Sequence, residues 1–427
     1  MAVFRRYKIK QWIYRSIYVG VLLFATLQLK SKEIDNSKLA PLTSLNISRQ
    51  SSFEESKGNT HQNQTPIPDI GRPLVVPRIC RILKTAKISD GWPFRGKLLF
   101  VRDRPLYYCS IPKCGSTFMD HFLSVVFRCN GLCDHISIST LRTNMETPRL
   151  MSNAYSFMFV REPYARLFSA YENKLFLPNQ HWTIIGADVI RTERPYASLV
   201  SKMLGHDVTF IELVKYVLNL YERGVRLNDH LAPMHMHCDS CEFKFNFIGK
   251  MENMSSDLVR LVEDWKSKGI VSKSISSAKE IEANMLYKRS FGPYKHMFLI
   301  LKQYGSVMSR YKLFQRAWSS YQIRGLILKK YNMPFAEHEV AKINYIRFGD
   351  EIKKALDASM GHEDELKAQR KEAVVQAYKT VPMELMMKLR EFMKPDCLLF
   401  GYDVMPEFLF NRTSLPNSDG FDYFKGL

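Results

Sequence analysis

The chain has 427 residues, 46% of them hydrophobic, and carries a formal net charge of +20. Its length leaves room for one large domain or two smaller ones, and the ordinary apolar content excludes a chain that is disordered over most of its length. The excess of basic residues favours a polyanionic partner. Nucleic acid, anionic lipid and acidic glycans remain open, because charge alone does not separate them.

The N-terminus is predicted to form an uncleaved signal anchor. An apolar run over residues 17–29 follows a cluster of basic residues, and the aromatic side chains just before it suit a membrane interface. Counted from these aromatic residues, the run approaches the ~20 residues that a span requires, and no small-residue cleavage site follows it. We therefore expect a cytosolic tail (1–11), a transmembrane helix (12–29) and a flexible lumenal stem (30–75). A buried helix of a soluble protein is the alternative.

Sequons and cysteines agree with a lumenal, oxidising compartment. The chain has eight cysteines, an even number that is compatible with disulfides. Cys238 and Cys241 have the spacing of a zinc-ligand pair, but no second pair is evident nearby, so disulfides are favoured over zinc. Four glycosylation sequons begin at Asn46, Asn63, Asn253 and Asn411.

The first chemical motif follows an edge strand predicted at residues 97–101. A second apolar run leads into residues 111–117, which read IPKCGST, and a helix is expected over residues 118–127. Backbone N–H groups at such a helix start bind phosphate, and Lys113 adds a full charge. The lysine precedes the glycine here, whereas the nucleoside triphosphate fingerprint has the opposite order, which weakens a kinase or ATPase interpretation. A tight turn without a ligand is the alternative.

A second motif follows the next predicted strand, residues 156–160. The apolar run is typical of a buried parallel strand, and Pro163 suits the first turn of the helix after it. Arg161 at the strand end and Ser169 two turns on can both reach an anion at the ligand-binding edge of a parallel sheet. A core strand followed by a surface helix is the alternative.

The rest of the chain continues to alternate strands and helices, which predicts an α/β fold with a mainly parallel sheet. Residues 290–330 are basic and aromatic, which fits either a polyanion-binding lobe or the solvated face of helical hairpins. We expect helices at residues 211–220, 254–265 and 383–393, and strands at 243–248 and 397–404.

Together, the motifs IPKCGST (111–117) and FVREPYARLFSAY (159–171) resemble those of the Golgi carbohydrate sulfotransferases. The similarity is to the branch with the chondroitin and dermatan 4-O-sulfotransferases, the GalNAc 4-O-sulfotransferases and the natural-killer-epitope sulfotransferase. It spans about residues 98–404 and is interrupted by residues 272–371, which look like a basic helical insertion. Further similar segments are DHIS (134–137), NDH (228–230), CDSC (238–241), FIGKME (247–252), MKPD (393–396) and LFGY (399–402).

The resemblance implies a P-loop-like parallel sheet flanked by helices in a catalytic domain over residues 76–427. It implies transfer of the sulfuryl group from 3'-phosphoadenosine 5'-phosphosulfate (PAPS) to a sugar hydroxyl, without a metal, by a single-pass type II Golgi membrane protein. The acceptor is expected to be a glycosaminoglycan of the chondroitin or dermatan kind, or a glycoprotein glycan. The donor-binding residues are then Pro112, Lys113, Cys114, Gly115, Ser116, Thr117, Phe118, Arg161, Arg166 and Ser169.

Within this set, Lys113 is expected against the bridging oxygen, and Arg161 with Ser169 on the 3'-phosphate. His135 is the first choice for the general base, because it lies in the family's histidine segment, and His230 is the second. Either histidine has the alternative of a structural role. A catalytically inactive lumenal glycan-binding protein of the same fold is the competing function, and a nucleotide kinase or nucleic-acid-binding protein is the next.

The sequence departs from these relatives next to the expected acceptor site. Residues 114–118 read CGSTF where many relatives have a different small-residue pattern ending in tryptophan, and Leu231 replaces a tryptophan after the NDH segment. Donor binding is compatible with these changes. We expect these changes to affect which acceptor the protein prefers.

Overall fold

The computed structural model describes residues 80–81, 97–101, 104–127, 136–137, 153–238, 240–241, 245–271, 292–305, 308–412 and 420–427. The expected tail, anchor and stem (1–75), the first part of the expected insertion (272–291) and His135 lie outside these residues. Among the described helices, none has the length and apolar character that crossing a membrane requires.

A five-stranded sheet has the order β3-β1-β2-β4-β5. The neighbouring pairs β2–β4 and β4–β5 are parallel, and β1 is antiparallel to both β2 and β3. The expected parallel sheet is thus found in three strands, whereas the edge position predicted for β1 is taken by the short β3. The strands are β1 (Lys97–Val101), β2 (Arg104–Cys109), β3 (Ile136–Ser137), β4 (Tyr155–Val160) and β5 (Phe247–Lys250).

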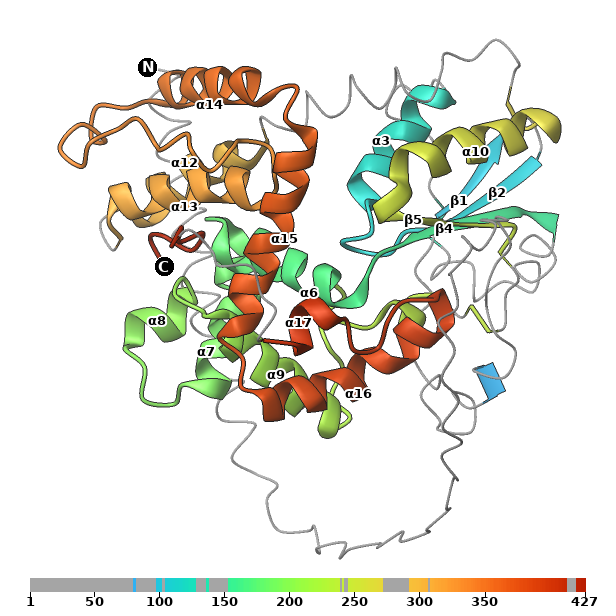
Figure 1. Ribbon diagram of the computed structural model, residues 1–427, viewed down its shortest axis with the longest axis horizontal. Coiled ribbons are helices and arrows are strands. Elements are labelled where there is room, and N and C mark those ends of the chain that lie inside the picture. The colour runs from blue at the N-terminus through green and yellow to red at the C-terminus, as the bar shows by residue number, and fades with distance from the viewer. Residues whose placement is uncertain are drawn as a thin grey trace, which may run out of the picture. The chain divides into compact units, whose positions relative to one another are not determined.

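The parallel strands are covered on both faces, which explains why β4 reads as a continuous apolar run and is buried at all six positions. On one face, α3 (Ser116–Val126) and α10 (Met254–Ser267) lie side by side over the sheet (Figure 1). Trp265 of α10 is fully buried there, with its ring 5.3 Å from that of Phe157. Met234 and Leu399 pack against the opposite face.

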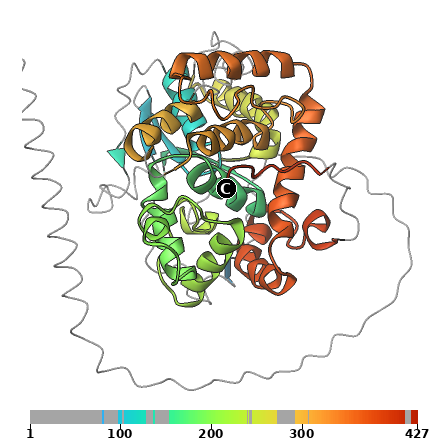
Figure 2. The ribbon, with the colours of Figure 1, turned by 90° about the vertical axis from the view of Figure 1, so that its left-hand side faces the viewer.

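The remaining helices form two further apolar cores. One gathers α6, α9, α15 and α16, and the other gathers α12, α13 and α14 around Phe314 and Phe348. Figure 2 shows the second group beside α15. The helical segments are α6 (Pro163–Tyr171), η1 (Glu172–Phe176), η2 (Gln180–Trp182), α7 (Ile185–Glu193), α8 (Leu199–Leu204), α9 (Phe210–Glu222), η3 (Met234–Met236), η4 (Met251–Asn253), α12 (Gly292–Tyr304), α13 (Arg310–Ile323), α14 (Tyr345–Ser359), α15 (Glu363–Lys379), α16 (Met383–Phe400) and α17 (Glu407–Phe410).

The helices expected at residues 211–220, 254–265 and 383–393 are confirmed as α9, α10 and α16. The strand expected at 397–404 is wrong, because α16 continues through Pro395 to Phe400 and ends at Gly401, whose φ is 65°. A short apolar run fits a buried helix as well as a strand, which is the reason for the error. The strand expected from residue 243 begins only at Phe247.

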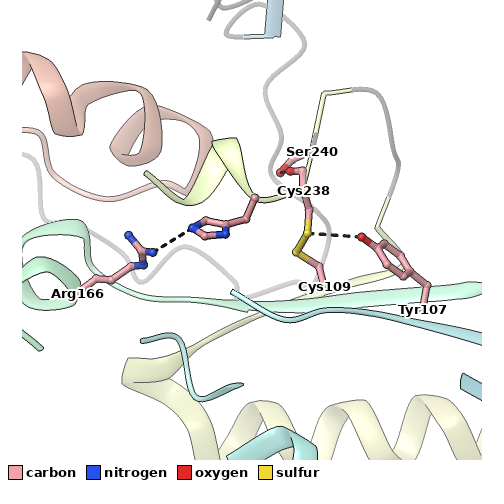
Figure 3. Close-up of a disulfide and its surroundings, with 6 residues drawn as sticks. Tyr107, Cys109, Arg166, Cys238 and Ser240 are labelled. Carbon is pink, nitrogen blue, oxygen red and sulfur yellow. Dashed lines mark hydrogen bonds between the residues drawn. A yellow bond between two sulfur atoms is a disulfide. The ribbon is translucent and has the colours of Figure 1, made fainter. Parts of the chain in front are cut away.

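Two disulfides join distant parts of the chain, which confirms the preference for disulfides over zinc. Cys80 pairs with Cys241, and Cys109 at the end of β2 pairs with Cys238 (Figure 3). The two neighbouring cysteines of the CDSC segment therefore bond to different partners. The second disulfide fixes the carboxyl end of β2 to the segment that follows η3.

Candidate active site

A cavity of about 200 Å³ lies beyond the carboxyl ends of β2, β4 and β5. Ligands of open parallel sheets bind at this edge, because loops from neighbouring strands converge there. The cavity wall includes most of the first motif, two residues of the second motif and a histidine. Its residues are Pro112, Lys113, Gly115, Ser116, Thr117, Arg161, Ser169, Asn173, Lys174, His230 and Met251.

The loop between β2 and α3 presents backbone donors to this cavity. Lys113 and Gly115 have left-handed backbones, with φ of 69° and 78°, so that the chain turns sharply before α3 begins at Ser116. A Cβ atom at Gly115 would lie 2.7 Å from Sδ of Met251 as well as being strained. The first turn of α3 contains no acidic residue, and no side chain caps it. Its N–H groups are therefore suited to an anion.

The Lys113 side chain is oriented by a neutral partner. Its Nζ donates a hydrogen bond to Oδ1 of Asn173 over 2.8 Å. Burial lowers the pKa of Lys113 well below its ordinary value, the carboxylate of Glu172 opposes this, and the positive charges of Arg324, Lys174 and Arg161 lower it further. An anionic ligand in the cavity would favour the charged ammonium.

Arg161 and Ser169 are brought to the same cavity by β4 and α6. Arg161 follows β4 directly, and its Nη1 donates to the Lys113 carbonyl at 3.4 Å. Glu162 then begins α6, because its carboxylate accepts the N–H groups of Tyr164 and Ala165 at 3.1 and 2.6 Å. The two motifs of the sequence thus meet in one cavity, as their positions after parallel strands predict.

Three residues of the expected donor-binding set lie behind the cavity wall. Arg166 is buried and donates to the carbonyls of Pro112 and Ala232 at 3.0 and 2.7 Å. It also contacts a histidine ring, that of His237, at 3.3 Å (Figure 3). Arg166 therefore stabilises the loop between β2 and α3 by hydrogen bonds and does not line the cavity.

Cys114 and Phe118 are the other two. The Cys114 thiol is buried and donates to Sδ of Met234 at 3.5 Å. Phe118 packs with Phe122 in the core under α3, with ring centroids 6.0 Å apart. Both side chains support the loop by packing.

His230 lies in the cavity wall. Its Nδ1 is 2.9 Å from Oδ1 of Asn228, an acceptor that fixes the proton on Nδ1 and leaves the Nε2 lone pair available. Burial, followed by the positive charges of Lys174 and Lys113, lowers the pKa of His230 to about 3. The imidazole is thus neutral near pH 7.

Sequence reasoning missed Asn173 and Lys174, which lie two and three residues after the end of the second motif. They belong to η1, a π-helical turn that continues α6 and brings both residues to the cavity. Lys174 Nζ lies 2.8 Å from Nε2 of His181. The sequence offered one indication of their role, which is that both lie within three residues of the end of the second motif.

The cavity lies where three parallel strands end, and its lining is suited to an anionic ligand. Residues 97–336 match the model of the sulfotransferase family. The match covers more than half of the chain and includes every residue of the cavity wall, so the chain belongs to this family. No solved structure matches the chain.

Several curated proteins are similar to the chain, and their names confirm the resemblance to carbohydrate sulfotransferases. Carbohydrate sulfotransferase 14 from Danio rerio is 31% identical over 166 residues, which are 36% of this chain and 44% of that protein. The Homo sapiens protein of the same name is 28% identical over 176 residues, 39% of this chain and 46% of the relative. Carbohydrate sulfotransferase 8 from Mus musculus is 29% identical over 172 residues, 37% and 41% of the two chains. The similarity spans less than half the length of each of these relatives.

Proposed function

We propose that this protein transfers the sulfuryl group of PAPS to a sugar hydroxyl of a glycan. The observation that carries the proposal is the meeting of two sets of anion-binding groups in one cavity: Lys113 with the start of α3, and Arg161 with Ser169. A donor with phosphate groups at both its 3' and 5' positions needs two such sets, whereas a single phosphate needs one.

The residues of the cavity fit this donor. Lys113 and the hydroxyls of Ser116 and Thr117 are suited to the 5'-phosphosulfate, and Arg161 and Ser169 to the 3'-phosphate. Within the part of the wall that the structure describes, no residue carries a carboxylate, so an anionic ligand meets no direct repulsion there. Arg166, Cys114 and Phe118 then contribute by holding the loop in place.

When bound, PAPS supplies the sulfuryl group, whose bond to the phosphate oxygen breaks as the acceptor oxygen attacks. Lys113 places positive charge where negative charge develops on the leaving oxygen. The backbone N–H groups at the start of α3 would hold the phosphate, so that the acceptor oxygen can approach sulfur from the side opposite the leaving oxygen. This arrangement lowers the barrier mainly by electrostatic stabilisation and alignment.

A histidine is proposed to accept the proton of the acceptor hydroxyl. His230 is supported by its place in the cavity wall and by an Nε2 lone pair that Asn228 leaves available. His135 is supported by its place between the two motifs in the sequence. The pH dependence of kcat/KM distinguishes the two candidates.

The proposed setting is the Golgi lumen, with residues 12–29 as a type II anchor and residues 76–427 as the catalytic domain. Two disulfides suit an oxidising compartment, and the sequon residues Asn253 and Asn411 are exposed. The names of the relatives, which are carbohydrate sulfotransferases, support a carbohydrate acceptor. The net charge of +20 supports an acidic one, such as a chondroitin- or dermatan-like glycosaminoglycan.

The proposal is tested by incubating the full-length protein with PAPS carrying radiolabelled sulfate and with separate chondroitin, dermatan, heparan and N-glycan acceptors. We expect label in a glycosaminoglycan, and calorimetric binding of 3'-phosphoadenosine 5'-phosphate (PAP). Binding of glycan without transfer to any acceptor would favour the alternative of an inactive glycan-binding protein. Absence of PAP binding would refute the donor site itself.

A further inference from the structure

The buried carboxylate of Glu172 links the cavity to the basic segment after residue 290. Glu172 is 4% exposed, and its Oε1 accepts hydrogen bonds from Ser320 Oγ at 2.5 Å and from Arg324 Nε at 2.9 Å. Ser320 lies in α13, and Arg324 is the residue that ends it. A buried carboxylate held by two groups of another helix has a fixed position.

The same helix holds the rest of η1. Arg316 of α13 is buried and donates to the carbonyls of Phe176 and Leu175, each at 2.7 Å. The π-helical turn is therefore fastened to α13 at both ends. The sequence suggested that residues 310–324 are part of an insertion. In the structure they contact η1, which contributes Asn173 and Lys174 to the cavity wall.

Asn173 connects these contacts between η1 and α13 to Lys113 of the first motif. Asn173 directly follows Glu172, and its Oδ1 accepts the hydrogen bond from Lys113 Nζ at 2.8 Å. A shift of Glu172 would move Asn173 away from Lys113. Glu172 itself does not line the cavity, so it acts on a bound ligand only through these neighbours.

The charges around Lys113 give Glu172 a second role. Arg161 from the end of β4, Lys174 from η1 and Arg324 from the end of α13 all oppose the positive charge of Lys113. Glu172 is the charged residue that acts against these three and favours the charge of Lys113. Asn173 and the neutral His230 carry no charge.

We infer that Glu172 is a positioning residue that keeps Lys113 both oriented and charged, and that α13 positions Glu172 for this purpose. The part of the inference that concerns catalysis rests on the proposed function. The electrostatic part concerns Lys113 alone and is measurable without any transfer reaction.

The test compares Glu172→Gln with Arg324→Gln in the full-length protein. These variants break the same ion pair from opposite sides, so a purely structural effect would act alike in both. An electrostatic effect acts with opposite signs, because removing the carboxylate lowers the pKa of Lys113 and removing the guanidinium raises it. Arg191→Gln, which breaks an exposed ion pair with Asp188 outside the cavity wall, is the matched control.

The probe is competitive acetylation with acetic anhydride over a range of pH, read by mass spectrometry of the peptide that contains Lys113. We expect Glu172→Gln to lower the pKa of Lys113, Arg324→Gln to raise it, and Arg191→Gln to leave it at the wild-type value. Shifts of the same sign in both variants, or no shift, would overturn the inference. Should Glu172→Gln fail to fold, Glu172→Asp replaces it, because the shorter side chain withdraws the carboxylate: a lowered pKa of Lys113 supports the inference, and an unchanged or higher value contradicts it.

Transfer kinetics separate this inference from the proposed function. If the wild-type protein transfers sulfate, the alkaline limb of kcat is expected to move with the pKa of Lys113 in each variant. Opposite acetylation shifts without sulfate transfer in the wild type would refute the proposed function and leave the assignment of Glu172 standing. Transfer in the wild type without those shifts would refute only the role of Glu172.

Discussion

Lys113 donates its ammonium hydrogen bond to Asn173, a residue 60 positions away in the chain, over 2.8 Å. The contact joins the loop after β2 to the π-helical turn after α6. The two motifs are therefore coupled through a side-chain pair in the cavity wall, in addition to their shared position at the sheet edge. A change at the end of the second motif should alter the lysine of the first.

Replacing Asn173 by alanine removes the acceptor that orients Lys113. We expect kcat to fall about tenfold, corresponding to about 1.4 kcal/mol of transition-state stabilisation, because the ammonium is no longer held at the leaving oxygen. Steady-state kinetics with saturating donor measure this effect. Asn219→Ala, in α9 and outside the cavity wall, is the matched control and should retain wild-type kcat. Equal kcat in Asn173→Ala and the control would show that the hydrogen bond between Lys113 and Asn173 does not contribute to turnover.

Replacing Arg161 by alanine is expected to weaken the binding of PAP. A hydrogen bond to a charged group contributes about 1.5–3 kcal/mol, so calorimetry should give a Kd raised roughly 10- to 150-fold. The control is Arg191→Ala, which breaks an exposed ion pair with Asp188 away from the cavity. An unchanged Kd for Arg161→Ala would mean that the second motif serves only as scaffold.

The pH dependence of kcat/KM identifies the histidine that acts as base. A base works only when unprotonated, and the pKa of His230 is lowered to about 3, so His230 stays competent as the pH falls towards 5. With His230 as base, we expect no acid limb between pH 5 and 7, and loss of kcat in His230→Ala. An acid limb near the ordinary histidine value of about 6.5, removed by His135→Ala, would instead assign the role to His135.

Asp396 of α16 is predicted to stabilise the fold beside the site. Its carboxylate accepts the backbone N–H of Met234 at 2.6 Å and Nδ1 of His235 at 2.7 Å. Burial alone raises the pKa of Asp396, but these contacts lower it overall. A lowered carboxyl pKa contributes stability above the unfolded-state value of about 4, and this contribution is lost as the pH falls through the folded-state value.

Asp396→Asn should therefore lower the free energy of unfolding at pH 7 by about 2–4 kcal/mol, since a buried hydrogen-bonded charge is replaced. Urea denaturation at pH 7 and at pH 3.5 measures the loss. The deficit relative to wild type should shrink at the lower pH. A deficit that is equal at both pH values would show that the charge of Asp396 contributes nothing.

Sequence reasoning predicted the parts of the site that depend on local patterns. The strand before Arg161 was recognisable as an apolar run, and the turn at Lys113 as small residues between a strand and a helix. Parallel strands bring their carboxyl ends together, so the meeting of Arg161, Ser169 and Lys113 followed from topology.

Other features depend on contacts between distant segments and had no local signal. Arg166 and Ser169 lie in one helix, yet Arg166 is buried against the Pro112 carbonyl and Ser169 lines the cavity. The π-helical turn at Glu172 depends on Ser320, 148 residues later. A sequence pattern gives no such partner in advance.

The central claim is that Lys113 stabilises the leaving oxygen during sulfuryl transfer. The most direct measurement is the rate at which Lys113→Ala moves radiolabelled sulfate from PAPS to the glycan that the wild-type protein uses. Thermal unfolding of the same preparation verifies that the variant is folded. We expect turnover to fall by about a thousandfold with an unchanged unfolding midpoint, because one preorganised charge is lost. A folded Lys113→Ala variant that transfers sulfate at the wild-type rate would contradict the account.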